Sequence, residues 1–147
     1  EVVQLLHRYG AVCRSSTITM AASAGYLDIL KLIYTADENS RHRILVAAEN
    51  GHVEVVKWLS SKGLNSTKWA MDHAAGNGHL NMVKWLHENS DDGCTVHAME
   101  MAAGNGHLEV VKFLHENRTE GCTTKAMDDA AINGHLEVVM CCFQNKT

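Results

Sequence analysis

The sequence predicts an all-α solenoid of stacked helix–turn–helix repeats, and two observations carry this prediction. First, one phrase occurs five times along the 147 residues: two alanines, a glycine three residues after the second alanine, and an aliphatic run. The spacings between successive copies are 26, 27, 28 and 28 residues. The alanine pairs begin at Ala21, Ala47, Ala74, Ala102 and Ala130. Second, apolar residues recur at helical spacing on both sides of each glycine. Self-similarity at such a period is typical of solenoids, whose units bury their apolar faces against one another.

Residues 94–121 illustrate the first helix of a repeat. Thr95 is predicted to cap it, because a threonine oxygen can accept a hydrogen bond from the first helical turn. Equivalent threonines occur in the neighbouring repeats: Thr67 and Thr123. One helical face then carries Met99, Ala102 and Ala103. The small alanines let two helices approach closely, and Gly106 is predicted to end the helix in a left-handed conformation.

The second helix of this repeat is predicted to run from about Leu108 to near Asn117. Its apolar stripe consists of Leu108, Val110, Val111, Phe113 and Leu114, and its solvent-facing residues are Lys112, His115 and Glu116. The aromatic position recurs in two other repeats, as Trp58 and Trp85, and is predicted to belong to the core. A short polar linker ending at Gly121 leads to the next repeat.

The whole chain, 1–147, is predicted to form one repeat domain. A trailing half-repeat over 1–12 precedes five repeats, over 13–40, 41–64, 65–93, 94–121 and 122–147. Because the chain begins with Glu1 and its first residues read as the back half of a repeat, we expect it to be part of a longer chain.

These repeats resemble the ankyrin repeat family. The strongest matches to its pattern are the segments 51–57 and 106–112, which read Gly-His-Val/Leu-Glu-Val-Val-Lys. Where the family's first helix opens with Thr-Pro-Leu-His, this chain has Met71-Asp72 and Met99-Glu100. Methionine thus replaces the buried leucine, and an acid replaces the histidine that normally ties neighbouring turns together. The period is also shorter than the usual length of about 33 residues. The resemblance therefore implies an ankyrin-like solenoid with trimmed hairpin fingers.

Composition limits the partners. The chain has 17 acidic and 13 basic residues and a formal charge of −4, which argues against a nucleic-acid partner. No apolar stretch is long enough to span a membrane. Five cysteines, placed at repeat and core positions, favour a reducing compartment, and we expect the cytoplasm. Three glycosylation sequons point the other way, at Asn65, Asn117 and Asn145.

The chain offers little for catalysis or metal binding. Four of its ten histidines follow the repeated glycines, so stacked equivalents should lie roughly 8–10 Å apart, too far to share one zinc ion. We expect each of these imidazoles to make a local hydrogen bond at its turn. Cys94 and His97 open one helix, but no second pair completes a zinc set. The sequence therefore predicts no catalytic residue, no metal site and no cofactor.

The resemblance implies a protein-binding module that uses the concave face formed by the first helices. At some positions the residue type changes from repeat to repeat while the helices and turns recur, so stacking does not determine which residue stands there. The predicted contact residues for a protein partner are Trp69, His73, His97, Met101, Lys125 and Asp129. Trp69 is the predicted apolar anchor. Two alternatives remain: a structural spacer within a longer array, and a thiol or zinc enzyme around Cys94 and His97.

Overall fold

The computed structural model describes residues 14–35, 39–119 and 121–144, and the regular elements in this part of the chain are all α-helices. The expected half-repeat over 1–12, Cys13 and the sequon at Asn145 lie outside the described residues. The helices are α2 (Ser15–Ser23), α3 (Leu27–Ile33), α4 (Ser40–Glu49), α5 (Val53–Ser61), α6 (Lys68–Gly76), α7 (Leu80–Asn89), α8 (Val96–Gly104), α9 (Leu108–Asn117), α10 (Thr124–Ile132) and α11 (Leu136–Gln144).

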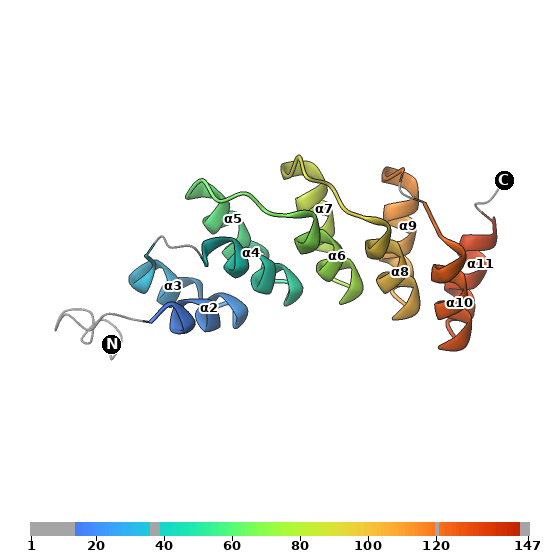
Figure 1. The fold of residues 1–147 in the computed structure, drawn as a ribbon, viewed down its shortest axis with the longest axis horizontal. Coiled ribbons are helices and arrows are strands. Elements are labelled where there is room, and N and C mark those ends of the chain that lie inside the picture. Colours follow the sequence, from blue (N-terminus) through green and yellow to red (C-terminus); the bar gives the residue numbers. More distant parts are fainter. Residues whose placement is uncertain (1–13, 36–38, 120, 145–147) are drawn as a thin grey trace.

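The helices form antiparallel pairs that stack along one axis into an elongated solenoid (Figure 1). The first helices of the pairs, α2, α4, α6, α8 and α10, form one layer, and the second helices form the other. The first helices pack much more closely on one another than the second helices do. Because the first helices pack more closely, the stack bends so that they lie on its inner side. We call them the first-helix layer.

Alanine and methionine explain the close packing of the first helices. Ala74, Ala75, Ala102 and Ala103 are fully buried, so neighbouring backbones approach without large side chains between them. The methionine that replaces the family's leucine is buried as predicted, at Met71 and Met99. The second helices contribute a second buried row: Val56, Leu59, Val83, Leu86, Val111 and Leu114.

The predicted glycine stop is confirmed, as the turn at Gly78 illustrates. Gly78 has a φ of +76°, a conformation that residues with a Cβ avoid. Its N–H donates to the carbonyl of Ala75 at 3.0 Å, and the N–H of His79 donates to that of Ala74 at 2.9 Å. This pair of bonds is the Schellman motif, which satisfies the last carbonyls of α6 and lets α7 begin at Leu80.

The histidine after each glycine reaches the preceding repeat, which corrects the prediction of a local bond at its own turn. His52 Nε2 lies 2.9 Å from the carbonyl oxygen of Ser23, 29 residues earlier. Its ring also lies over Gly25, where a Cβ would stand only 2.5 Å from Nδ1. The same contact recurs for His79 on Gly51, His107 on Gly78 and His135 on Gly106. These glycines are therefore required by the neighbouring repeat as well as by their own turn.

The acid that replaces the family's histidine also ties repeats together. Asp72 is only 1% exposed, and its two oxygens accept hydrogen bonds from the N–H and the hydroxyl of Thr95, at 2.8 and 2.7 Å. Thr95 also caps α8 as predicted, since its hydroxyl oxygen accepts from the His97 N–H at 3.1 Å. Thr67, predicted to cap α6 in the same way, makes no such bond.

The aromatic position on the second helices is half-buried, so the prediction that it belongs to the core was only partly right. Trp58, Trp85 and Phe113 pack on the core but keep one side toward solvent. Lysines lie over two of these rings, Lys62 over Trp58 at 5.2 Å and Lys84 over Phe113 at 5.8 Å. The outer surface of the second helices is thus an aromatic row partly covered by lysine side chains.

The connections between repeats are short, as the shortened period predicted. Residues 62–67 and 90–95 each link two repeats with six residues, and the described part of the chain contains no strand. The hairpin fingers are absent from these linkers. Among the described helices, none has both the length and the apolar character needed to cross a membrane.

Candidate functional site

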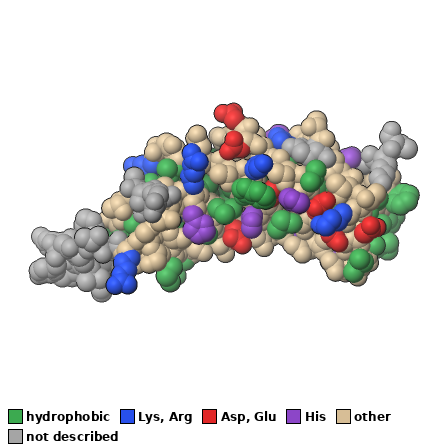
Figure 2. Space-filling view, viewed as in Figure 1, with side chains coloured by type: hydrophobic (Ala, Val, Ile, Leu, Met, Phe, Trp, Pro, Cys, Tyr) green, Lys and Arg blue, Asp and Glu red, His purple; other side chains and the backbone are tan. Residues whose placement is uncertain are grey.

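The predicted contact residues lie on the first-helix layer, which faces the viewer in Figures 1 and 2. Figure 2 shows hydrophobic, histidine, acidic and basic side chains alternating across the middle of this surface. Trp69, His97 and Lys125 occupy the same position in three successive repeats, on α6, α8 and α10. Their exposed fractions are 47%, 53% and 63%, the latter two for the side chain alone. Exposure at this position is therefore confirmed.

Trp69 and His97 stack on each other across the gap between two repeats. Their ring centroids are 6.5 Å apart, and the ring planes differ by 16°. The stack holds the indole in place while leaving nearly half of it open to solvent. A rigid, half-exposed tryptophan is the type of side chain that anchors protein interfaces.

Glu100 connects the aromatic stack to the next repeat. It is 7% exposed, and its Oε2 lies 3.1 Å from both His97 Nδ1 and Lys125 Nζ. Its other oxygen accepts a hydrogen bond from the hydroxyl of Thr123 at 2.9 Å. Glu100 therefore plays the inter-repeat role of Asp72 and also holds two of the predicted contact residues.

The electrostatics of Glu100 follow from these partners. Burial alone raises the pKa of its carboxyl, but the hydrogen bonds from His97 and Thr123 lower it. Lys125 lowers it further through a hydrogen bond and its charge, so the pKa of Glu100 lies below its ordinary value. The hydrogen bond to Glu100, followed by that to Asp129, raises the pKa of Lys125. Glu100 and Lys125 therefore both stay charged at neutral pH.

A shallow groove of about 200 Å³ lies between α8 and α10 beside this cluster. Three of the predicted contact residues line it: Met101, Lys125 and Asp129. Lys125 Nζ lies 3.4 Å from Asp129 Oδ2 across one helical turn. Two asparagine amides complete the polar wall, Asn105 donating to the Gly76 carbonyl and Asn133 to the Gly104 carbonyl, each at 2.7 Å. We call it the α8–α10 groove.

His73 is the predicted residue that does not join this group. Its Nδ1 lies 3.7 Å from Glu49 Oε1 on α4, on the other side of α6. The structure therefore links Trp69, His97, Lys125 and Asp129 through ring stacking and Glu100, and it places Met101 beside them. His73 lies on the same helix as Trp69, but it pairs with Glu49 of the preceding repeat.

Sequence reasoning missed Glu100, Asn105 and Asn133 as parts of this surface. The asparagines stand one residue before the turn glycines, where they read as helix ends. The recurrence of asparagine there was the available signal. Within its own repeat, Glu100 only departs from the family pattern. Its partner Thr123 lies 23 residues later, in the next repeat, so the sequence of one repeat does not reveal the contact.

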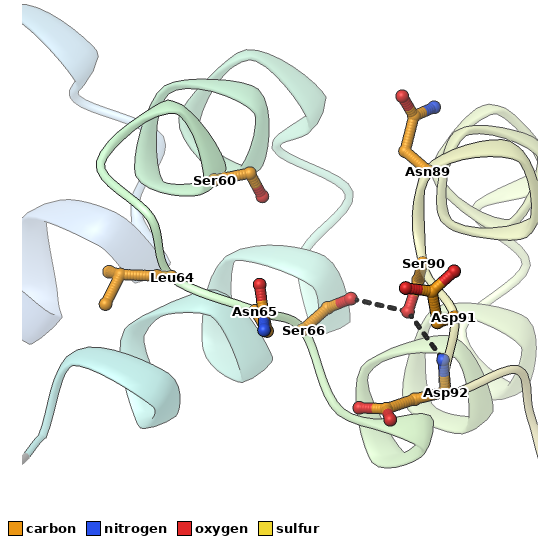
Figure 3. Close-up of a pocket in the computed structure, with 8 residues that line it drawn as sticks. All are labelled: Ser60, Leu64, Asn65, Ser66, Asn89, Ser90, Asp91 and Asp92. Carbon is orange, nitrogen blue, oxygen red and sulfur yellow. Dashed lines mark hydrogen bonds between the residues drawn. The ribbon is translucent and has the colours of Figure 1, made fainter.

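A second hollow lies among the linkers between repeats. This pocket of about 290 Å³ is lined by Leu64 and by polar side chains of 60–66 and 89–92 (Figure 3). The Ser66 hydroxyl donates to Ser90 Oγ at 2.9 Å, which joins two successive linkers. The ionisable residues that line the pocket are Asp91 and Asp92, and among the described residues neither histidine nor cysteine lines it.

The enzyme alternative around Cys94 and His97 gains no geometric support. His97 stacks on Trp69 and contacts Glu100, and Cys94 is half-buried beside the core. Within the described residues, no three histidine, cysteine or acidic side chains cluster closely enough to hold a metal ion.

The comparisons with known proteins agree with the repeat architecture. A search of curated proteins found no match. A comparison with protein families matched the description "Ankyrin repeats (3 copies)" over residues 18–98 and 71–141. These matches together cover most of the sequence and all of the stacked helices but the first residues of α2 and the last of α11. The chain therefore belongs to the ankyrin repeat family.

Proposed function

We propose that the chain binds a protein partner through the first-helix layer, with Trp69 as the apolar anchor and the α8–α10 groove as the polar part of the site. Ankyrin repeats are generally protein–protein interaction modules. The observation that carries the proposal is the exposed Trp69–His97 stack, held through Glu100 to Lys125 on the next repeat.

The surface suits a protein better than a small molecule. The α8–α10 groove is shallow, and about 200 Å³ falls below the range of about 300–1,000 Å³ usual for small-ligand pockets. An exposed aromatic anchor with charged groups of both signs around it matches the apolar centre and polar rim of protein interfaces. A partner would insert an apolar side chain against Trp69 and Met101 and present polar groups to Lys125 and Asp129. We infer no catalysis and no nucleic-acid binding.

The anchor is tested with Trp69→Lys. Lysine already occupies the equivalent position as Lys125, so the fold tolerates it. Met20→Lys is the matched control, since Met20 is a 71% exposed apolar residue on the first-helix layer two repeats away. Partners are captured from a cell lysate with the parent chain, identified by mass spectrometry, and titrated against all three chains.

We expect Trp69→Lys to lower the affinity for the captured partner by at least about fivefold, which corresponds to about 1 kcal/mol of binding free energy. Met20→Lys should leave this affinity unchanged. Unchanged affinity of the Trp69→Lys chain, with helicity intact, would contradict the assignment. Replacing His97 and Lys125 together is a poorer test, because it strips the buried Glu100 of two partners.

A second candidate function is a spacer within a longer array, and the surface beyond α10 and α11 favours it. We call this surface the end face and define it by Asp128, Ala131, Ile132 and Leu136. Ile132 and Leu136 are 80% and 68% exposed. Asp128 and Ala131 are also exposed, although in the preceding repeat Glu100 and Ala103 are buried. Among the described residues, no atom lies within 4 Å of a Cβ placed on Gly134, where the earlier equivalents meet a histidine.

The spacer function is tested by joining a copy of residues 94–121 in phase after the last repeat. If the end face accepts a further repeat, the unfolding midpoint rises, and Asp128→Asn becomes destabilising only in the extended chain. A midpoint that stays the same, with Asp128→Asn neutral in both chains, would count against stacking there.

We infer a cytoplasmic location, because the cysteines occupy positions that suit free thiols in a reducing compartment. Asn65 and Asn117 are both exposed, so a glycan on either of them in the expressed protein would contradict this inference.

A further inference from the structure

Two cysteine side chains meet in the last repeat. Cys122 lies in the linker just before the cap of α10, and Cys142 lies on α11. Their sulfur atoms are 2.6 Å apart. A disulfide bond needs about 2.0 Å, so a small side-chain movement would bring the two atoms to bonding distance.

The pair comes from a substitution specific to this repeat. The position of Cys122 holds Cys94 and Ser66 in the two preceding repeats, whereas the position of Cys142 holds Leu114 and Leu86. Among these three repeats, only the last has a cysteine at both positions. The pair does not take part in the proposed binding surface.

We propose that Cys122 and Cys142 are a redox-active pair that a small-molecule disulfide converts into an intramolecular disulfide. Cys122 is half-buried and Cys142 is 3% exposed, so Cys122 reacts first. Its thiolate attacks one sulfur of the small disulfide, whose S–S bond breaks and releases one small thiolate. Cys142 then loses its proton to solvent and attacks the Cys122 sulfur, which releases the second small thiolate. Two electrons pass from the protein thiols to the small disulfide, which becomes two thiols.

The neighbouring Cys141 is a poor competitor in this exchange. Burial raises the pKa of the Cys141 thiol, and the adjacent Cys142 raises it further. A smaller fraction of Cys141 is therefore present as the reactive thiolate than for a thiol with an ordinary pKa.

The bond would fix the last described repeat, whose end face exposes Ile132 and Leu136. It would join the linker before α10 to α11 and close a loop of about twenty residues, which restricts the unfolded chain. Oxidation is therefore expected to strengthen the docking of α11 on α10, where Met140 and Phe143 leave 53% and 70% of their surface exposed.

The test starts from the fully reduced 147-residue chain, incubated at neutral pH with oxidised glutathione and quenched with acid. We expect the intact mass to fall by two hydrogen atoms and peptide mapping to find Cys122 linked to Cys142. The oxidised chain should also unfold at a higher temperature than the reduced chain.

The chain itself supplies the matched variants. Cys122→Ser copies Ser66 and Cys142→Leu copies Leu114, so both should fold while forming no such link. Cys94→Ser should form the link as readily as the parent. The proposal is overturned if the native chain gives no intramolecular link, if Cys141 or Cys13 is joined instead, or if the native pairing is no more selective than pairing in concentrated urea.

Discussion

Gly78→Ala is expected to destabilise the array more than Gly63→Ala, although both glycines have left-handed backbones. Their φ angles are +76° and +82°. A Cβ on Gly78 would lie 2.6 Å from His107 Nδ1 and 2.7 Å from its Cε1, whereas a Cβ on Gly63 would have no atom of the described part of the chain within 4 Å. The comparison therefore separates the cost of the backbone conformation from the cost of crowding the next repeat.

The two costs can be worked out from this geometry. Holding alanine in the left-handed region costs about 1–2 kcal/mol, at either position. At Gly78 the imidazole must also move by about 0.8 Å to restore the 3.4 Å of ordinary contact. The backbone of His107 cannot shift freely to carry the ring away, because its main-chain N–H donates to the Ala102 carbonyl at 2.8 Å. Overpacking of this kind costs about 1–3 kcal/mol more.

Urea unfolding followed by far-ultraviolet circular dichroism measures both variants. We expect a loss of about 2–5 kcal/mol for Gly78→Ala and about 1–2 kcal/mol for Gly63→Ala. Adding His107→Ala to Gly78→Ala should recover part of the difference, because the clash disappears with the ring. Equal losses for the two glycine variants, or no coupling between Gly78 and His107, would refute the reasoning.

Three further predictions concern the polar contacts between repeats. Asp72→Asn should lower the free energy of unfolding by about 1–3 kcal/mol, because one oxygen that accepts a hydrogen bond from Thr95 is replaced by an amide donor. Asp128 is exposed, so Asp128→Asn should change this free energy by less than about 0.5 kcal/mol in the same urea titration. Thr95→Ala, which removes a helix cap and this contact, should lower the thermal midpoint more than Thr67→Ala, and similar midpoints would count against the cap. Because the pKa of Glu100 is lower in the folded chain, its stabilisation is present above about pH 4.3 and is lost as the pH falls toward its folded pKa. Glu100→Gln should therefore flatten the acid limb of the curve of unfolding free energy against pH, and curves of the same shape would contradict this.

The helices and turns could be predicted because their causes are local. A turn glycine, an alanine pair and a helical spacing of apolar residues lie within one repeat, so residues 94–121 alone indicated where α8 and α9 begin and end. The contacts between repeats could not be predicted in this way. The acceptor of the Thr95 hydroxyl is a carboxylate 23 residues earlier, and His52 reaches a carbonyl 29 residues earlier.

The candidate site shows the same division. The exposure of Trp69 followed from the charged residues at its equivalent positions, His97 and Lys125. That Trp69 stacks on His97, and that Glu100 joins His97 to Lys125, depends on how adjacent repeats are rotated against each other. A pattern within a single repeat carries no information about that rotation.

Two contacts give the array a direction: the turn histidine that lies over the glycine of the preceding repeat, and the buried acid that accepts hydrogen bonds from the next repeat. At each interface the earlier repeat supplies the space over a turn glycine, as at Gly78, and the later repeat supplies the imidazole. Between α6 and α8 and between α8 and α10, the earlier repeat also supplies a carboxylate, Asp72 or Glu100, and the later repeat supplies a threonine. On the ribosome the earlier repeat emerges first, so the glycine and the carboxylate are made before the imidazole and the threonine that contact them. At about 5–20 residues per second, a period of 28 residues takes roughly 1–6 s to synthesise, whereas helical proteins fold in microseconds to milliseconds. Each repeat thus has time to dock before the next one appears, so synthesis and assembly can proceed in the same order along the chain.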